Sequence, residues 1–343
     1  IKQKVSSEEK LASNVIRTLE SIYTGASVSE KTKNVVPTSG LIDYTFDYSC
    51  TDGTSFIGIQ GQSARYEESV QPIFSPTTIR TARLILWSLP YNYPFKTSDL
   101  LFVTSDNTLY LIVGESEFKD EFIKAAAPET NTPARINVLD VSSEEFQAVN
   151  PGKQYQVRVI DVSGNIIRNN DPVPEKLRPF DDHLVTALRF SPDGKQVEFF
   201  TKKGDAWKSE NQGNPIPILS LGGEKDAAKY AAIFAGSSEI YTCNMAKALK
   251  RLQHVHTVYS LRYEELKTIV NTNPASECPN LYEGFDTNLQ NLLQKHKLAI
   301  LTCLQSITNN NDLSACSELQ LSADALHTFN SEKLANSLCP ALY

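Results

Sequence analysis

The chain has 343 residues, of which 41% are hydrophobic and 21% are charged, and its formal net charge is −7. This composition is ordinary for a globular protein and too apolar for a disordered one. The acidic balance and the scattered lysines and arginines argue against a nucleic-acid-binding protein, which would carry a basic patch. The longest apolar runs, such as residues 84–87 and 109–113, are too short to cross a bilayer, so we expect no membrane span.

Residues 6–23 have the pattern of an amphipathic helix, and the polar tract 24–39 that follows has the pattern of a linker. The apolar stripe of the helix must be buried, either on the chain's own domain or on another subunit. Its members are therefore candidates for a partner interface: Leu11, Val15, Leu19 and Ile22.

From residue 38 to 222 the pattern is mostly that of antiparallel strands. Alternating residues 44–50, the turn Asp52-Gly53 and the apolar residues after it predict a β-hairpin. We expect helical inserts near 76–88 and 117–126. Further hairpin turns are predicted at Asp106-Asn107, Ser163-Gly164-Asn165, Pro192-Asp193-Gly194 and Lys203-Gly204.

From about residue 224 the apolar period becomes helical. It predicts a long helix after Ser237 or Ser238, a second helix from Asp286 and a third from Ser322 to Leu338. We therefore predict an α+β protein with an N-terminal amphipathic helix and linker, an antiparallel β-rich middle region and a C-terminal, disulfide-stapled helical bundle. The expected domains are residues 1–37, 38–222 and 223–343.

The compartment is suggested by the six cysteines, which form no C-x-x-C pair. An even number of cysteines without metal spacing predicts disulfide bonds in an oxidising compartment. The chain begins at Ile1 and has one methionine, Met245, which we interpret as a removed leader or a fragment. The absence of any N-x-[ST] site favours a bacterial periplasm over a eukaryotic secretory route.

The first predicted disulfide is Cys303–Cys316. The helix that carries Cys303 ends in the Asn-rich segment 308–312, and so short a connection brings the two thiols within range. The remaining pairs stay open, because six cysteines allow many connectivities. Cys243 with Cys278 or Cys339 would staple the bundle, and Cys50 would then reach into the helical region or stay a buried thiol.

Neither a G-x-S-x-G, an H-E-x-x-H, a P-loop nor a G-x-G-x-x-G motif occurs, so we predict no catalytic, metal or cofactor residue. His256 and His296 both lie on predicted helix seams. We expect polar core histidines there, and the alternative is a two-His metal site across facing helices.

The stretch WSLPYNYPF, residues 87–95, is a candidate contact surface. Its aromatic residues cluster around two prolines, which favour an extended loop. Exposed aromatic rings on a loop often bind protein or glycan, and the alternative is a lid folded over the β core. The candidates are Trp87, Tyr91, Tyr93 and Phe95.

The last third of the chain resembles the IcmX family, the periplasmic component of Dot/Icm type IVB secretion systems of Legionella-like bacteria. The resemblance lies in the stretches KYAAIFAGSSEIYTCNMAKALKRLQHVHTVYSLRYEEL and PASECPNLYEGFDTNLQNLLQKHKLAILTCLQSI, within an acidic, Asn-rich chain with cysteine-bearing helices. It implies a periplasmic part of a translocation machine that acts beside a polytopic, DotA-like inner-membrane subunit. The family has no established catalytic residues, so none is carried over.

Two functions are therefore expected. The first is a non-enzymatic structural component, homo-oligomeric within a complex, that helps to form an effector translocation route. The alternative is an exported enzyme or glycan-binding protein that uses the β-rich region.

Overall fold

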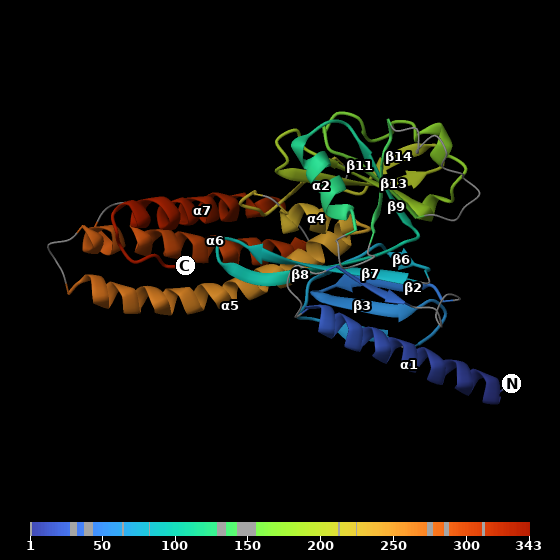
Figure 1. Ribbon diagram of the computed structural model, residues 1–343, viewed down its shortest axis with the longest axis horizontal. Helices are drawn as coiled ribbons and strands as arrows, with labels where there is room; N and C mark the ends of the chain where they lie inside the picture. The colour runs from blue at the N-terminus through green and yellow to red at the C-terminus, as the bar shows by residue number, and fades with distance from the viewer. Residues whose placement is uncertain are drawn as a thin grey trace.

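The computed structural model describes residues 2–27, 33–37, 44–63, 65–81, 83–128, 135–142, 156–211, 213–223, 225–272, 277–284, 288–310 and 313–343. Within them, one helix comes first, β sheets form the middle of the chain, and helices form its end (Figure 1). The predicted α+β class and its order of elements are confirmed.

The N-terminal helix α1 (Lys2–Ser27) packs on the chain's own β sheets. Val15 and Leu19 are buried with strand residues such as Phe46, and Ile22 is partly buried beside them. The hydroxyl groups of Tyr23 and Tyr48 are hydrogen-bonded at 2.6 Å. The partner-interface hypothesis is therefore wrong for Val15 and Leu19, because their own sheets cover them. The side chain of Leu11 lies outside the described residues.

The first sheet contacts α1 through its strands β3 and β4 and has the strand order β4-β3-β2-β6. The predicted hairpin is confirmed, since Asp52 and Gly53 adopt positive φ angles between paired strands. Its strands are β2 (Phe46–Thr51), β3 (Thr54–Ile59), β4 (Arg65–Glu68) and β6 (Thr78–Ile79).

The second sheet has the order β1-β7-β8-β5, and its central strands β7 and β8 are buried on both faces over most of their length. Leu84 and Leu86 enter the core shared with α1, while Ile85 and Trp87 enter a larger core with the C-terminal helices. The helical insert predicted near 76–88 is wrong, because a strand buried on both faces shows no alternation of polar and apolar residues. The strands are β1 (Lys33–Pro37), β5 (Ile73–Phe74), β7 (Arg83–Asn92) and β8 (Lys96–Ser105).

The third sheet has the order β10-β9-β11-β12-β13-β14, with β15 paired to β13. The pairs among β10, β9, β11 and β12 are parallel, and the rest are antiparallel. The helical insert near 117–126 is confirmed as α2 (Glu117–Ala126), which connects β9 to β10. The strands are β9 (Thr108–Val113), β10 (Asn137–Asp140), β11 (Gln156–Asp161), β12 (Val185–Phe190), β13 (Gln196–Lys203), β14 (Ala206–Ser209) and β15 (Ile216–Pro217).

Two of the four further turns predicted form hairpins. They are Pro192-Asp193-Gly194 between β12 and β13, and Lys203-Gly204 at the end of β13. The turn at Asp106-Asn107 is present, but it carries the chain from β8 in the second sheet to β9 in the third, so a hairpin there is wrong. The segment 163–165 follows β11 as a loop without a returning strand in the described residues.

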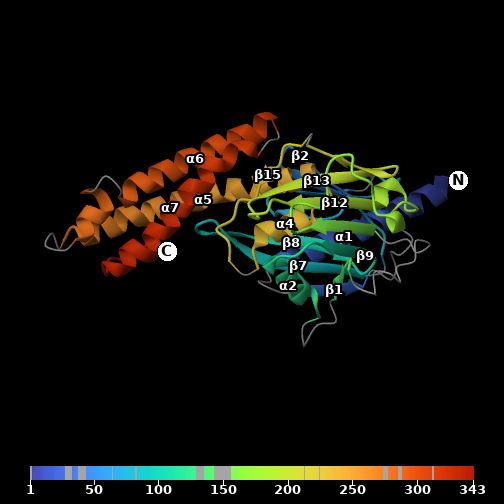
Figure 2. The same cartoon turned by 90° about the horizontal axis from the view of Figure 1, so that it is seen from above.

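The C-terminal helices form an arm that extends away from the sheets (Figures 1 and 2). We call residues 253–270 of α5, together with α6 and α7, the helical arm. Short 3-10 segments (Glu175–Leu177, Asp182–Leu184, Ser314–Cys316) and π-helical segments (Asn280–Gly284, Phe329–Leu334) complete the fold. The helices are α4 (Ala227–Phe234), α5 (Ser238–Val270), α6 (Leu289–Asn310) and α7 (Ser317–Thr328).

All six cysteines form disulfide bonds. Cys303–Cys316 is present as predicted, with its α-carbons 4.7 Å apart. Cys243 bonds neither Cys278 nor Cys339, which bond each other. Instead Cys50 reaches α5 and bonds Cys243, because the β2–β3 hairpin lies against the first turns of that helix. These bonds are typical of a protein from an oxidising compartment.

Leu19→Ala should lower the free energy of unfolding by about 2–5 kcal/mol, because it leaves a cavity between α1 and the sheets. Urea denaturation under non-reducing conditions measures the change. Arg17→Ala, at an exposed position of the same helix, is the matched control and should change it by less than about 0.5 kcal/mol. Equal stability of the two variants would contradict the docking of α1.

Candidate functional site

The strongest arrangement of reactive groups lies where β3 meets α5. The ammonium group of Lys247 donates a hydrogen bond to Ser55 Oγ at 2.6 Å, and both side chains are buried. The disulfide bond sets this geometry. Ser55 is the cross-strand neighbour of Cys50, and Lys247 lies one helical turn beyond Cys243.

A serine beside a lysine is a known arrangement for nucleophilic catalysis, provided that the lysine can lose its proton. Burial lowers the pKa of Lys247 to about 7, and the negative charge of Glu68 opposes this shift. A lysine with this pKa can act as a general base near neutral pH. The electrostatics of the pair thus suit the activation of Ser55.

The geometry does not suit a reaction. The Lys247 ammonium group also donates to the backbone oxygens of Glu68 at 2.7 Å and Gln71 at 3.3 Å, and Ser55 donates to Asn244 Oδ1 at 3.0 Å. The cavity bordered by Ser55 and Asn244 has no room for a water molecule. A reacting atom must come within about 3 Å of the nucleophile, and here none can.

We therefore assign a structural role to this cluster and name it the lysine clamp: Ser55, Glu68, Gln71, Asn244 and Lys247. Asn244 adds to it by accepting the backbone N–H of Ile73 at 3.0 Å. The clamp ties α5 to three successive segments of the first and second sheets.

A second buried cation, Arg158 on β11, borders a small pocket of about 30 Å³. Burial lowers the pKa of Arg158 to about 10. Its guanidinium group donates to the backbone oxygens of Ala232, Ala235 and Gly236, at the carboxyl end of α4. A cation there is stabilised by the free carbonyl groups and the helix dipole, so Arg158 caps α4.

His256 and His296 contact each other in the core of the helical arm, with ring centroids 5.6 Å apart. His256 Nε2 lies 3.0 Å from the Leu293 oxygen, and His296 Nδ1 lies 3.0 Å from Ser322 Oγ. Burial lowers the pKa of both rings, that of His296 to about 3. Among the described residues no group of three or more His, Cys, Asp or Glu side chains could hold a metal ion.

The predicted aromatic surface is not a surface. Trp87, Tyr91, Tyr93 and Phe95 are all buried, which corrects their assignment as exposed contacts. The β7–β8 hairpin inserts them against the helices, where Trp87 packs edge-on against Tyr230 at 5.0 Å. The nearby backbone does border an open pocket of about 390 Å³, between residues 89–92 and 220–227.

The carboxyl ends of parallel strands are the usual place for a ligand where neighbouring connections diverge, as they do at β9 and β11. Here that edge is closed. A Cβ atom on Gly114 would lie 2.6 Å from Ser163 Cβ. The carboxylate of Asp161 accepts the backbone N–H groups of Ser163, Gly164, Ile166 and Ile167, so it holds the loop over the strand ends.

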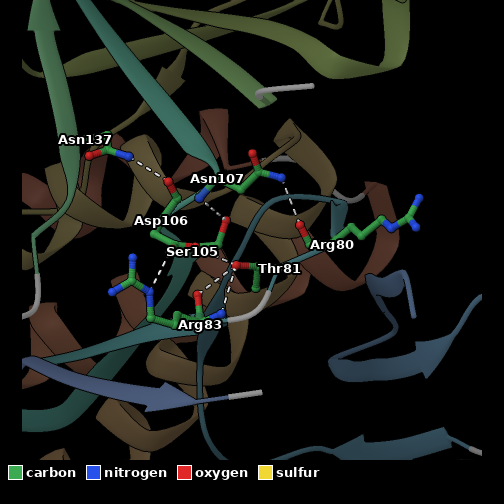
Figure 3. Close-up of polar contacts among 7 residues, drawn as sticks. All are labelled: Arg80, Thr81, Arg83, Ser105, Asp106, Asn107 and Asn137. Atoms are coloured by element: carbon green, nitrogen blue, oxygen red, sulfur yellow. Dashed lines mark hydrogen bonds and ion pairs between the residues drawn. The ribbon is translucent and has the colours of Figure 1, made fainter. Parts of the chain in front are cut away.

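The turn at Asp106-Asn107 gathers charged and polar groups that satisfy one another (Figure 3). The Asp106 carboxylate accepts from Thr81 Oγ1 at 2.7 Å and from Arg83 Nε at 2.6 Å. Its backbone oxygen accepts from Asn137 on β10. These bonds join the second sheet to the third, so this cluster also has a structural role.

No protein-family model, curated protein or solved structure matches this chain. The candidate sites therefore rest on their own geometry. Sequence reasoning missed the pair of Ser55 and Lys247 because 192 residues separate them. The only signal was that Ser55 lies close in sequence to Cys50, and Lys247 close to Cys243. This signal predicts the pair only once the Cys50–Cys243 bond is known.

The free energy of unfolding should rise by about 2 kcal/mol between pH 7 and pH 9 because of Lys247. An unfolded lysine keeps its proton up to a pKa of about 10.4, whereas the folded one loses it from about 7. The unfolded state therefore binds more protons in this window, and stability increases with pH. Urea denaturation at several pH values checks this, and Lys247→Met should remove the slope.

Stability should fall by about 2 kcal/mol between pH 7 and pH 5 because His296 stays neutral in the folded state. The unfolded histidine gains a proton below about 6.5, so acid favours unfolding. His296→Gln keeps an amide near Ser322 and should flatten this part of the pH profile. An unchanged acid slope in the variant would show that His296 is protonated in the folded protein.

Proposed function

We propose that this chain is a non-enzymatic structural subunit of an envelope secretion or conjugation machine and acts by binding other proteins. The disulfide bonds support an exported protein. The most reactive pair of side chains, Ser55 and Lys247, is closed to substrates and serves the fold. The helical arm then remains as the part of the molecule with a surface suited to partners.

One observation carries the proposal: three large apolar side chains are exposed on the outward face of α5, on the helical arm. Val258, Leu261 and Ile269 are 63%, 64% and 58% exposed and fall on one side of the helix. The opposite side is buried against the rest of the arm through His256, Tyr263 and Val270. Large exposed apolar groups of this kind mark protein contacts when they cluster.

The resemblance to the IcmX family gives this proposal its setting. In that setting the chain lies in the periplasm and helps to form the effector translocation route of a Dot/Icm type IVB system. Its partner is a polytopic, DotA-like inner-membrane subunit that receives the outward face of α5. Among the described residues no helix is long and apolar enough to span a membrane.

The test is to purify the tagged chain from detergent-solubilised envelopes of its host, measure the native mass and identify the chains that co-elute. A defined complex that contains a polytopic membrane subunit supports the proposal. A chain that elutes as a monomer, without other proteins, contradicts the proposal. That result favours the alternative, a glycan-binding protein that uses the 390 Å³ pocket beside residues 89–92.

The double variant Val258→Asp, Leu261→Asp should recover at least about tenfold less of the membrane subunit, because two charges would be buried in the contact. Its melting temperature should stay within about 2 °C of the parent's, since both positions are exposed. Val70→Asp is the matched control, because Val70 is 60% exposed but lies near the sheets. Equal recovery of the subunit by both variants would exclude the arm as the binding surface.

A further inference from the structure

The outward face of α6 carries a row of exposed residues, with two leucines at its centre, that no helix of the described chain covers; we call this row the α6 seam. Its members are all exposed, and Leu298 and Leu301, at its centre, are 66% and 41% exposed. Successive members are spaced by three and four residues, as in the contact seam of a coiled coil. They are Asn291, Gln294, Leu298, Leu301, Gln305 and Thr308.

This seam lies opposite the side by which α6 packs into the arm. The buried side includes Leu293, His296, Ile300, Cys303 and Ile307, and it contacts α5 and α7 (Figure 2). The seam is therefore not part of the bundle's own core. A helix with two leucines pointing outward between amide side chains is suited to a further helix on that side.

The four central residues of the seam, Gln-Leu-Leu-Gln, read the same in both directions, and both outer residues, Asn291 and Thr308, are polar. A twofold axis between residues 299 and 300 places Leu298 opposite Leu301 of a second, antiparallel helix. The same axis places Gln294 opposite Gln305, and Asn291 opposite Thr308. Leucines thus meet leucines at the centre, and glutamine amides, each both donor and acceptor, meet on either side.

The charges next to the seam also suit self-association. The seam itself has no acidic or basic residue. The two flanking lysines, Lys295 and Lys297, lie opposite Leu304 and Thr302 of the second helix, so no two like charges face each other in this register. A partner of different sequence would require none of this symmetry.

We propose that the α6 seam binds a second copy of this chain, with the two α6 helices antiparallel. Such an interface is isologous, because one patch serves both copies. At 1.5 Å per residue the seam is about 26 Å long, so the contact is smaller than a standard interface of about 800 Å² per partner and the dimer is concentration-dependent. The proposal is independent of the partner site on α5.

Sedimentation equilibrium of the full, oxidised chain between about 1 and 300 μM tests the proposal, and we expect a monomer–dimer equilibrium within this range. Leu298→Glu should weaken dimerisation at least about tenfold, because it places a carboxylate against the opposing leucine. Val70→Glu, an exposed position near the sheets, is the control and should leave the dimer unchanged. Thermal melts confirm that both variants fold.

A charge pair tests the register. Gln294→Glu with Gln305→Lys should tighten the dimer at low salt, because each glutamate would face a lysine of the other copy. Gln294→Lys with Gln305→Lys should abolish it. Within one α6 these positions are 11 residues apart, about 16 Å, so the difference arises between copies.

Three results would overturn the proposal: a monomer at every concentration, a dimer insensitive to Leu298→Glu, or equal behaviour of the two charge variants. The last would mean that the copies meet in another register or that the seam binds a different chain. If Leu298→Glu abolishes the dimer but the variant still co-purifies with the membrane subunit, the α6 seam and the face of α5 are two independent binding sites.

Discussion

The attachment of α5 to the β2–β3 hairpin is the contact on which the rest of the architecture depends. The Cys50–Cys243 bond joins residues 193 positions apart, and closing so long a loop stabilises a fold by about 5 kcal/mol on the chain-entropy model. One helical turn further on, Lys247 donates to three oxygen atoms, on β3, on β4 and on the connection from β4 to β5. Moving the helix would leave the buried Lys247 ammonium group and Ser55 hydroxyl without these partners, so the clamp specifies one position for the helix.

This attachment divides α5 into two halves with different surroundings. Residues 240–249 are buried on all sides, so this half is core for the sheets. Beyond residue 253 the fully buried positions are His256, Tyr263 and Val270, seven residues apart. The chain is covered on one side there, by the other arm helices and by Phe95 of the β7–β8 hairpin, whose ring stacks on Tyr259. A helix anchored at one end and covered on one side at the other end is a rigid support for outward contacts. The exposed apolar residues Val258, Leu261 and Ile269 on its outer face are the ones that the proposed function assigns to partner binding.

What the sequence predicts well is local chemistry, and what it predicts poorly is the partner of each segment. Asp52-Gly53 and Asp106-Asn107 carry equivalent turn signals, yet the first closes a hairpin and the second passes the chain between sheets. Trp87 and its neighbours have the composition of a loop surface but lie in a strand buried on both faces. Cys303–Cys316 was predictable because a short connection links the two residues. Cys50–Cys243, and with it the approach of Ser55 to Lys247, depends on contacts across most of the chain.

The two outward faces of the arm differ in a way that agrees with the different partners proposed for them. On α5 the apolar residues Val258, Leu261 and Ile269 alternate with Arg262 and Glu265, an asymmetric pattern that suits a partner of different sequence. On α6 the seam is uncharged and its four central residues are symmetric, which suits a second copy. Each face is opposite the side by which its helix packs into the arm, so the two faces point away from each other. A dimer through α6 therefore leaves both α5 faces open, and one dimer presents two identical partner sites related by its twofold axis. Two linked sites of this kind raise the effective concentration of a partner that is itself oligomeric, so weak contacts on each α5 face are sufficient for stable assembly.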